Sequence, residues 1–475
     1  MLSWRLWRPL LLATLPLGML TACSDDIDSN EADVTDVANS KVKNQSIGNC
    51  WVYASIGWAE SLHLTQTGIE LNLSESWISY WHWYEQIAGA PKNLTRVASL
   101  ENGKIGAGGF FGVAAEIMRR YGVIPEGSFI PEEAEAARSS RQSSALAAIN
   151  ESLTNGALKT AAARKDRKLV RKELDKAWGL STAVSANIDS VFGADVSKTL
   201  LTSGLTIPTA TGIIRPKDIP VGHSITLADA IGEPSSSTNV LKRTGKYAWN
   251  EQSYPTTAKD RREFFRKMQR SLNVGMPVIM VWYVDFNALD SQNRFMQPPA
   301  TPGHQGGHMT VLEDYQVSNV PGYGTLAAGT LVTDNKALEA SLDEKATIDF
   351  VRIKNSWGTS LAPPNASNDL RGYYDIYKKY LDGPLTKCTE SNGDKCGTKT
   401  TGPGITSMVF PPDAFVTDAL VKEGACSDIC VAGPARSPSC DPCTDLICSE
   451  DAYCCANAWD ATCIQTANEI CDQGC

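Results

Sequence analysis

The distribution of cysteine most constrains what this chain can fold into. Ten of its 14 cysteines lie in the last 50 residues, which is typical of a small exported module held by disulfides in place of a large core. Cys388 and Cys396 bracket a short loop and form a further candidate pair. We therefore expect a separate cysteine-rich module over 425–475 and twelve disulfide-bonded cysteines. The twelve are Cys388, Cys396, Cys426, Cys430, Cys440, Cys443, Cys448, Cys454, Cys455, Cys463, Cys471 and Cys475.

Zinc is the alternative reading of the tail, because Cys440 and Cys443 have the spacing of a metal-binding turn. The tail contains no histidine, and export to an oxidising compartment favours disulfides. We expect no metal and no cofactor.

The N-terminus has the features of an export signal. Arg5 and Arg8 precede the apolar run "PLLLATLPLGML", which is too short for a comfortable membrane span. The next residues, "LTAC", end at Cys23 and resemble the cleavage site of a bacterial lipoprotein signal. This predicts a signal peptide over 1–22, lipidation of Cys23 as a membrane anchor, and an acidic flexible tether over 23–40. An ordinary signal peptide or an uncleaved anchor is the alternative.

The bulk composition is that of a globular protein. The chain has 475 residues, is 42% hydrophobic and 20% charged, and carries a formal charge of −9. This length predicts more than one domain. No block of Lys and Arg stands out, so we expect no nucleic-acid partner.

The middle of the chain changes from helical to strand-rich. Residues 131–178 are rich in Ala, Glu, Lys and Arg and poor in proline, which predicts helices. After about Thr206, short apolar runs predict strands. The expected strands cover 277–286, 308–317, 329–334, 348–355 and 372–380. This order predicts an α+β fold with two lobes.

Cys50 is the candidate nucleophile. It is the one cysteine left over if Cys23 carries lipid and twelve others pair. It also begins a predicted helix in "NQSIGNCWVYASIGWAESLHL", where the helix dipole and free N–H groups favour a thiolate. The alternative is a small buried thiol without chemistry.

A thiol nucleophile needs a base and a group that orients the base. Of five histidines, His308 opens an apolar strand, whereas His304 lies in the preceding loop. "IKNSWG" then offers the Asn355 amide to orient an imidazole and the Trp357 indole to shield the bond from water. His63 and His82 lie in predicted helices, where we expect them to be structural, and His223 lies in a loop with Pro and Gly.

These motifs together resemble the papain superfamily of cysteine peptidases. "VKNQSIGNCW", "LNLSESW", "GGFFGVAAEIMRRYGV", "GGHMTVLEDYQV" and "KNSWG" occur in that family's order. The resemblance implies a papain-like two-lobe fold, with a helical left lobe and an antiparallel β-rich right lobe, over 41–385. A helical insertion is expected at about 131–205, and a linker with a Cys loop at 386–424.

The resemblance also implies roles for seven residues and a peptide or protein substrate. The roles are nucleophile (Cys50), base and acid (His308), orienter (Asn355), oxyanion donor (Gln45), and substrate-binding positions (Gly108, Gly109 and Trp357).

Some features depart from the family pattern. Gln45 is five residues before Cys50, one fewer than expected, which leaves Asn44 as an alternative donor. His308 follows Cys50 by 258 residues, against about 130–150 in papain. This layout is more similar to the bleomycin hydrolase and aminopeptidase C branch, whose chain terminus plugs the cleft. Only 26 residues separate Cys23 from Cys50, so the usual inhibitory propeptide is missing.

We expect an endopeptidase outside the cytoplasm, membrane-anchored in the periplasm or at the cell surface, or secreted. A disulfide-bonded tail is too bulky to enter a groove built for one extended strand. This favours an open cleft over the plugged cleft of an aminopeptidase, which is the first alternative. "GNCWVYA" also resembles the nucleophile stretch of transglutaminases, so an acyl transferase is a second alternative. A catalytically silent surface-binding protein is the third.

Overall fold

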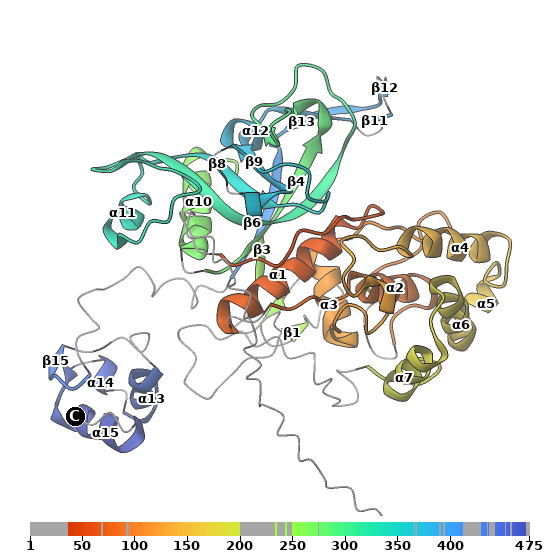
Figure 1. The fold of residues 1–475 in the computed structure, drawn as a ribbon, viewed down its shortest axis with the longest axis horizontal. Coiled ribbons are helices and arrows are strands. Elements are labelled where there is room, and N and C mark those ends of the chain that lie inside the picture. The colour runs from red at the N-terminus through yellow and green to blue at the C-terminus, as the bar shows by residue number, and fades with distance from the viewer. Residues whose placement is uncertain are drawn as a thin grey trace, which may run out of the picture.

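The structure is a computed structural model in which two lobes meet and a small module lies at the C-terminal end (Figure 1). It describes residues 37–67, 70–91, 94, 96–199, 233–234, 243–244, 249–273, 275–364, 366, 368–388, 391–392, 395–411, 429–434, 436, 442–451, 453–456 and 458–471. The expected signal peptide, Cys23, His223 and the tail cysteines Cys426, Cys440 and Cys475 lie outside these residues.

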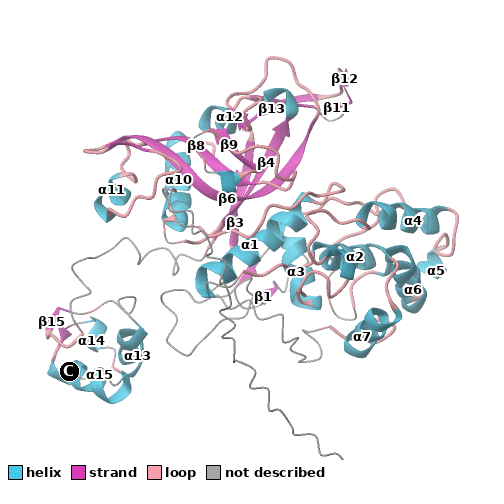
Figure 2. Ribbon diagram, viewed as in Figure 1, coloured by secondary structure: helices cyan, strands magenta, loops and turns pink. Residues whose placement is uncertain are grey.

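The first lobe is helical, as Figure 2 shows by colour. Ser74 caps its second helix by accepting a hydrogen bond from the Trp77 backbone N–H. The lobe is packed by aromatic rings, among them Trp81 stacked on Tyr121 at 4.0 Å between centroids. Its elements are α1 (Cys50–Thr67), α2 (Glu75–Ala88), α3 (Phe111–Tyr121), η1 (Pro131–Glu133), α4 (Gln142–Thr154), α5 (Ala161–Lys165), α6 (Arg167–Trp178) and α7 (Thr182–Phe192). The last five elements confirm the helices predicted after residue 131.

The second lobe contains an eight-stranded sheet in the order β3-β14-β4-β6-β8-β9-β5, with β7 paired to β6. Only the β5–β9 pair is parallel among these pairings. The strands are β3 (Asn250–Ser253), β4 (Val278–Asp285), β5 (Arg294–Phe295), β6 (Gln305–Val320), β7 (Gly324–Leu326), β8 (Thr347–Lys354), β9 (Tyr373–Tyr377) and β14 (Ile405–Phe410). The α+β two-lobe expectation is therefore confirmed.

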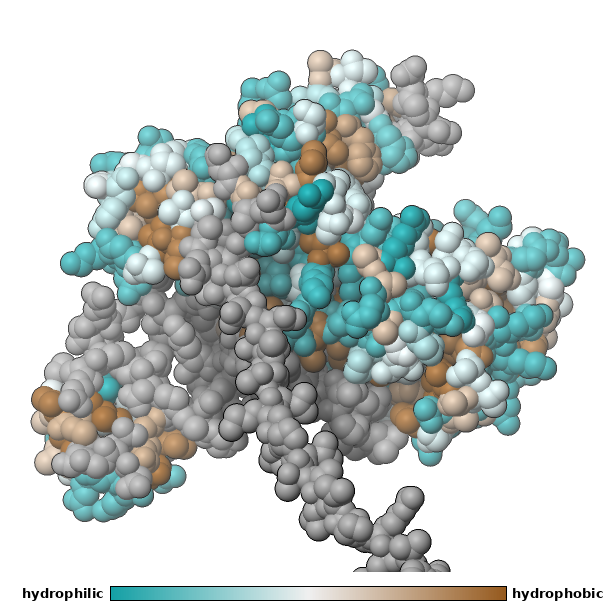
Figure 3. Space-filling view, in the orientation of Figure 1, coloured by the Kyte–Doolittle hydropathy of each residue, from teal (hydrophilic) through white to brown (hydrophobic). Residues whose placement is uncertain are grey.

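Helices cover both faces of this sheet at its centre. The apolar run in β4 is typical of a strand buried on two sides, and α10 contacts it as well as α1 from the other lobe. A notch remains between the lobes on the face shown in Figure 3. The other helices of this lobe are α11 (Asn335–Ala340), α12 (Lys378–Asp382), η2 (Phe286–Ala288) and η3 (Asn368–Leu370), and α10 is Ala258–Leu272.

Two sequence expectations about this lobe are corrected. Residues 329–334 form no strand: Gly329 has a φ of 78° and donates its N–H to the Asp314 carboxylate, and Asp334 caps α11. Residues 386–424 are not only a linker, because β14 at 405–410 is a buried strand between β3 and β4. Its "ITSMVF" run has the β-forming composition that such a position requires.

Three short strand pairs complete the description of the two lobes. They are β1 (Glu233–Pro234) with β2 (Arg243–Thr244), β10 (Leu385–Cys388) with β13 (Lys399–Gly402), and β11 (Ser391–Asn392) with β12 (Lys395–Cys396). The predicted Cys388–Cys396 disulfide closes the last hairpin.

The C-terminal module has a core of its own around Trp459. Disulfides join Cys443 to Cys471, Cys448 to Cys455, and Cys454 to Cys463, and Cys430 is also disulfide-bonded. Cys443 is thus a disulfide partner and not a zinc ligand. The elements are β15 (Gly433–Pro434), α13 (Pro442–Glu450), α14 (Tyr453–Ala456), β16 (Ala458–Trp459) and α15 (Ala461–Cys471).

The disulfides are those of a chain that matures in an oxidising environment. Within the described ranges, no helix has both the length and the hydrophobicity that crossing a bilayer requires.

Candidate active site

Cys50 is the first residue of α1, as the sequence predicts. The turn before it is closed by a hydrogen bond of 2.8 Å from the Asn49 N–H to the Ile47 carbonyl. The buried Asn49 side chain donates to the Gln142 Oε1 atom at 3.0 Å and to the Ser79 hydroxyl at 3.3 Å. Because Gln142 begins α4, the expected insertion supports the turn that presents the thiol. Sequence reasoning missed this support, since nothing local links Asn49 to Gln142.

Cys50 is the one free cysteine among the described residues and is half-buried. Burial raises the pKa of its thiol, against hydrogen bonds from the backbone of Met309, Trp51 and Cys50 itself. Burial thus opposes the thiolate that the helix N-terminus was expected to favour. The contact with the Met309 backbone also places the thiol against β6, at the residue that follows His308 in the sequence.

The indole of Trp51 anchors the glycine segment of the helical lobe. Its Nε1–H donates to the Ala107 carbonyl at 2.8 Å. A Cβ on Gly109 would lie 2.5 Å from the Trp51 ring, whereas a Cβ on Gly108 would meet nothing within 4 Å. Gly109 is thus required by packing. Both glycines are exposed to a ligand, and only Gly108 leaves room for an added atom. His82 is buried against Trp51 at 4.7 Å, and its place is structural, as expected.

His308 of β6 meets Asn355, which directly follows the neighbouring strand β8. His308 Nε2 lies 2.7 Å from Asn355 Oδ1, and both residues are buried. The Trp357 indole stacks on the His308 ring at 4.7 Å with an interplanar angle of 21°. The structure therefore brings together the imidazole, the amide and the shielding indole that the sequence singled out.

The surroundings of His308 decide its protonation. Burial lowers its pKa to about 4, and the hydrogen bond to Asn355 acts in the opposite direction. A neutral imidazole bonded through Nε2–H to an amide oxygen leaves Nδ1 as a proton acceptor. His304 is exposed and stacks on Phe286 at 5.8 Å instead.

Gln45 contacts the segment that follows Asn355. Its Oε1 accepts from the Ser356 hydroxyl at 2.6 Å, and its Nε2 donates to the Ile47 carbonyl at 3.0 Å. Asn44, the alternative donor, forms a β-bridge with Trp357. The structure thus ties the loop before Cys50 to the segment after Asn355.

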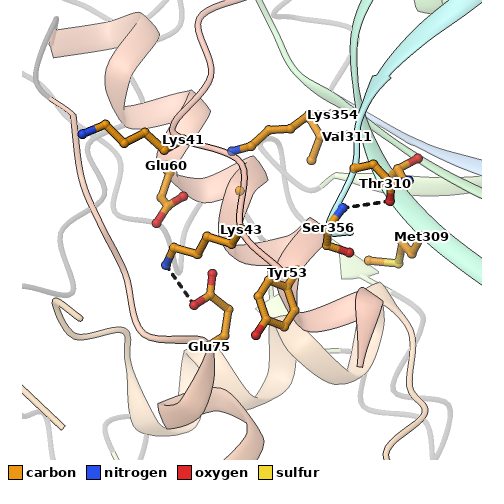
Figure 4. Close-up of a pocket in the computed structure, with 13 residues that line it drawn as sticks. Lys41, Lys43, Tyr53, Glu60, Glu75, Met309, Thr310, Val311, Lys354 and Ser356 are labelled. Atoms are coloured by element: carbon orange, nitrogen blue, oxygen red, sulfur yellow. Dashed lines mark hydrogen bonds and ion pairs between the residues drawn. The ribbon is translucent and has the colours of Figure 1, made fainter. Parts of the chain in front are cut away.

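A small cavity lies behind this site, at the meeting of the two lobes (Figure 4). Its volume of about 20 Å³ has room for a water molecule. Ionisable side chains line it, among them the buried Glu60, Glu75 and Lys354, and sequence reasoning missed them because they come from distant segments. The charged residues that line it are Lys41, Lys43, Glu60, Glu75 and Lys354.

Comparison with known families assigns the class of the enzyme. Residues 18–192, which contain Cys50, match the model of the peptidase C1-like family. The chain is a cysteine-type peptidase. His308 and Asn355 lie outside the matched range. Residues 424–475 match a domain of unknown function, DUF8252, which coincides with the cysteine-rich module of this peptidase.

Three solved structures are similar to this peptidase at low identity. PepW from Lactobacillus rhamnosis HN001 (DR20) has 13% identity and a TM-score of 0.38, covering 83% of this chain and 85% of that one. Bromelain protease from Ananas comosus, in complex with the E64 inhibitor, has 12% identity and a TM-score of 0.27, covering 79% and 94%. The Carica candamarcensis cysteine protease CMS1MS2, in complex with E-64, has 14% identity and a TM-score of 0.28, covering 78% and 92%. No curated protein matches the chain.

Proposed function

We propose that this peptidase hydrolyses peptide bonds of peptide or protein substrates with Cys50 as nucleophile, His308 as base and acid, and Asn355 as orienter. The observation that carries the proposal is the 2.7 Å contact between His308 Nε2 and Asn355 Oδ1, covered by the Trp357 indole. The partly exposed thiol of Cys50 lies against the same strand, at Met309.

Burial raises the pKa of Cys50 and lowers that of His308, so both shifts favour the uncharged thiol and imidazole. The proposed reaction starts from this pair, with the proton on sulfur. His308 Nδ1 takes this proton as the sulfur attacks the carbonyl carbon, and the resulting imidazolium gives it to the leaving amine. Water then attacks the thioester with His308 as base, which releases the acid and restores the thiol. Asn355 holds the ring through both steps.

The negative oxygen of the tetrahedral intermediate needs donors. The Cys50 backbone N–H at the start of α1 is one of them. A primary amide has two N–H groups, and Gln45 gives one to Ile47, so its second is the proposed partner.

Hydrolysis is tested with a peptide library and the Cys50→Ala variant. We expect cleavage by the wild type, and none by Cys50→Ala or after labelling with an epoxide thiol inhibitor. Incorporation of dansyl-cadaverine without hydrolysis would instead establish an acyl transferase. Absence of both activities, with no epoxide labelling, would leave the silent binding protein.

We further propose that the cleft is open and that the enzyme is an endopeptidase. Ile405 of β14 pairs with Trp282, which pairs with His308, whereas Val409 pairs with Ile279. The chain therefore runs away from the His308 level as it leaves the sheet toward the module. Internally quenched peptides with a blocked N-terminus should be cleaved. If they resist while free-amine substrates are cleaved, the enzyme is an aminopeptidase.

Anchoring through Cys23 completes the proposal. The "LTAC" motif and the acidic segment after it support a lipid-modified N-terminus outside the cytoplasm. Mass spectrometry of the exported protein should find a lipid mass on Cys23. An unmodified N-terminus would contradict the anchor.

A further inference from the structure

The segment that enters the peptidase from the expected tether packs between the two lobes. The sequence assigns residues 37–40 to the flexible tether, yet Val37 is buried in the core of the sheet lobe. The Ala38 carbonyl accepts a hydrogen bond of 2.5 Å from the Ser61 hydroxyl of α1. Ser40 follows, with 6% of its surface exposed.

Ser40 joins two buried ionic groups from opposite lobes. Its Oγ accepts from the Lys354 ammonium at 2.7 Å and donates to the Glu60 carboxylate. Glu60 belongs to α1 and Lys354 is the last residue of β8. In Figure 4 the Lys354 side chain extends toward the side of the cavity from which Glu60 projects.

Lys354 is covalently next to the residue that orients the imidazole. β8 ends at Lys354, and Asn355 then turns its Oδ1 to His308 and to the backbone N–H of Ser356 at 2.8 Å. A side chain that fixes the end of β8 therefore also fixes the starting point of Asn355. The sheet pairing ends at this residue: Lys354 is opposite Val311 of β6 and Tyr373 of β9, and Asn355 lies beyond both pairs, so the Lys354 side chain is a further tie at the strand end.

We propose that Ser40 is a positioning residue for the peptidase reaction, acting by holding the Lys354 ammonium against Glu60 so that the strand end presents Asn355 to His308. This inference rests on the proposed function. It makes the last residues of the expected tether part of the support of the active site.

The charges around Lys354 determine how this support depends on pH. Burial lowers the pKa of Lys354 to about 8, and Glu60 opposes the change. Lys43 also lowers it, while Glu75 and Glu70 raise it. Because the folded pKa is below the ordinary value of 10.5, the ammonium is present below about pH 8 and is lost above it. Removing a hydroxyl that accepts from the ammonium lowers this pKa further.

The test compares Ser40→Ala with Ser40→Thr, which keeps the hydroxyl. We expect Ser40→Ala to lower kcat roughly tenfold, less than the ~10²-fold that a 1 Å misplacement can cost, with KM unchanged. The alkaline limb of the pH profile of Ser40→Ala should move to lower pH. Ser40→Thr should restore both kcat and the position of this limb. Ser61→Ala is the matched control, since it frees the same segment without touching Lys354, and it should keep the wild-type kcat and pH profile.

A second pair separates positioning from mere stability. Lys354→Met should lower kcat of the folded enzyme and abolish the shift of the alkaline limb that Ser40→Ala causes. Arg352 lies on the same strand as Lys354 and forms a buried ion pair with Asp375 of β9. Arg352→Met breaks this pair and should reduce stability while keeping kcat per folded molecule. Folded fractions come from circular dichroism, and active fractions from epoxide titration.

The proposal is overturned if folded Ser40→Ala and Lys354→Met keep the wild-type kcat and pH profile. It is also overturned if Ser61→Ala and Arg352→Met lower kcat equally. Failure of the proposed function would appear beforehand and separately, as thiol-independent activity retained by Cys50→Ala.

Discussion

The two halves of the active site are held by different kinds of structure. The thiol half lies at the start of a helix buried among aromatic side chains, and Trp51 locks the neighbouring glycine segment. The imidazole half depends on one amide and one indole, Asn355 and Trp357, from a single short segment. A tightly packed site is destabilised by added atoms, whereas a hydrogen-bonded pair is destabilised by loss of either partner. The predictions below exploit this difference.

The largest effect is expected from removing the base. His308→Ala should lower kcat/KM about 10⁴-fold, because the thiol then has no proton acceptor. His304→Ala is the control and should stay close to wild type, since that ring is exposed against Phe286. Steady-state hydrolysis of one fluorogenic peptide measures both. The assignment of the base is wrong if the two results are exchanged.

Loss of the orienting amide should be milder. Asn355→Ala leaves the imidazole stacked under Trp357 but without its Nε2 partner, so we expect kcat to fall roughly 10–10²-fold. Trp357→Phe keeps a stacking ring and should fall less. A wild-type kcat in Asn355→Ala would mean that stacking alone orients His308.

The thiol half should respond to added volume. Gly109→Ala places a Cβ 2.5 Å from the Trp51 ring and should lower the free energy of unfolding by about 1–3 kcal/mol. Gly108→Ala meets nothing within 4 Å and should change it by less than about 0.5 kcal/mol. Urea unfolding compares the two. Equal destabilisation would contradict the packing role of Trp51.

The acid limb of the pH profile reports the imidazole half. His308 must be neutral to act as base, and burial lowers its pKa to about 4. Activity is therefore present above this value and is lost as pH falls through it, about tenfold per pH unit. The acid limb of kcat/KM should lie near 4. A limb near 6.5, the ordinary value for histidine, would show a solvated ring.

Much of this architecture was readable from the sequence because the signals are local. Cys50 at a helix start, His308 at a strand and Asn355 at a strand end follow from residue patterns within short windows. The strand expected at 329–334 does not form, because Gly329 lies in a turn and Asp334 caps α11.

Long-range polar contacts were not predictable. Ser40 and Lys354 are 314 positions apart, and Asn49 and Gln142 are 93 apart. A lone serine in an acidic stretch or a glutamine in a polar helix has no pattern that identifies such a partner. β14 was missed for a similar reason, because its place between β3 and β4 depends on strands far away in sequence.

The smallest effect is expected at the C-terminal module. Its core around Trp459 contains no residue of the two lobes, and three disulfides close within it. Truncation after Pro411 should therefore leave kcat/KM at its wild-type value and change the free energy of unfolding by less than about 0.5 kcal/mol. Truncation after Pro403 is the control: it removes β14 from the middle of the sheet and should prevent folding of that lobe. Purified variants can be compared by urea unfolding and peptide hydrolysis. A marked loss of activity in the longer variant would mean that the module docks on the peptidase and supports either half of the site.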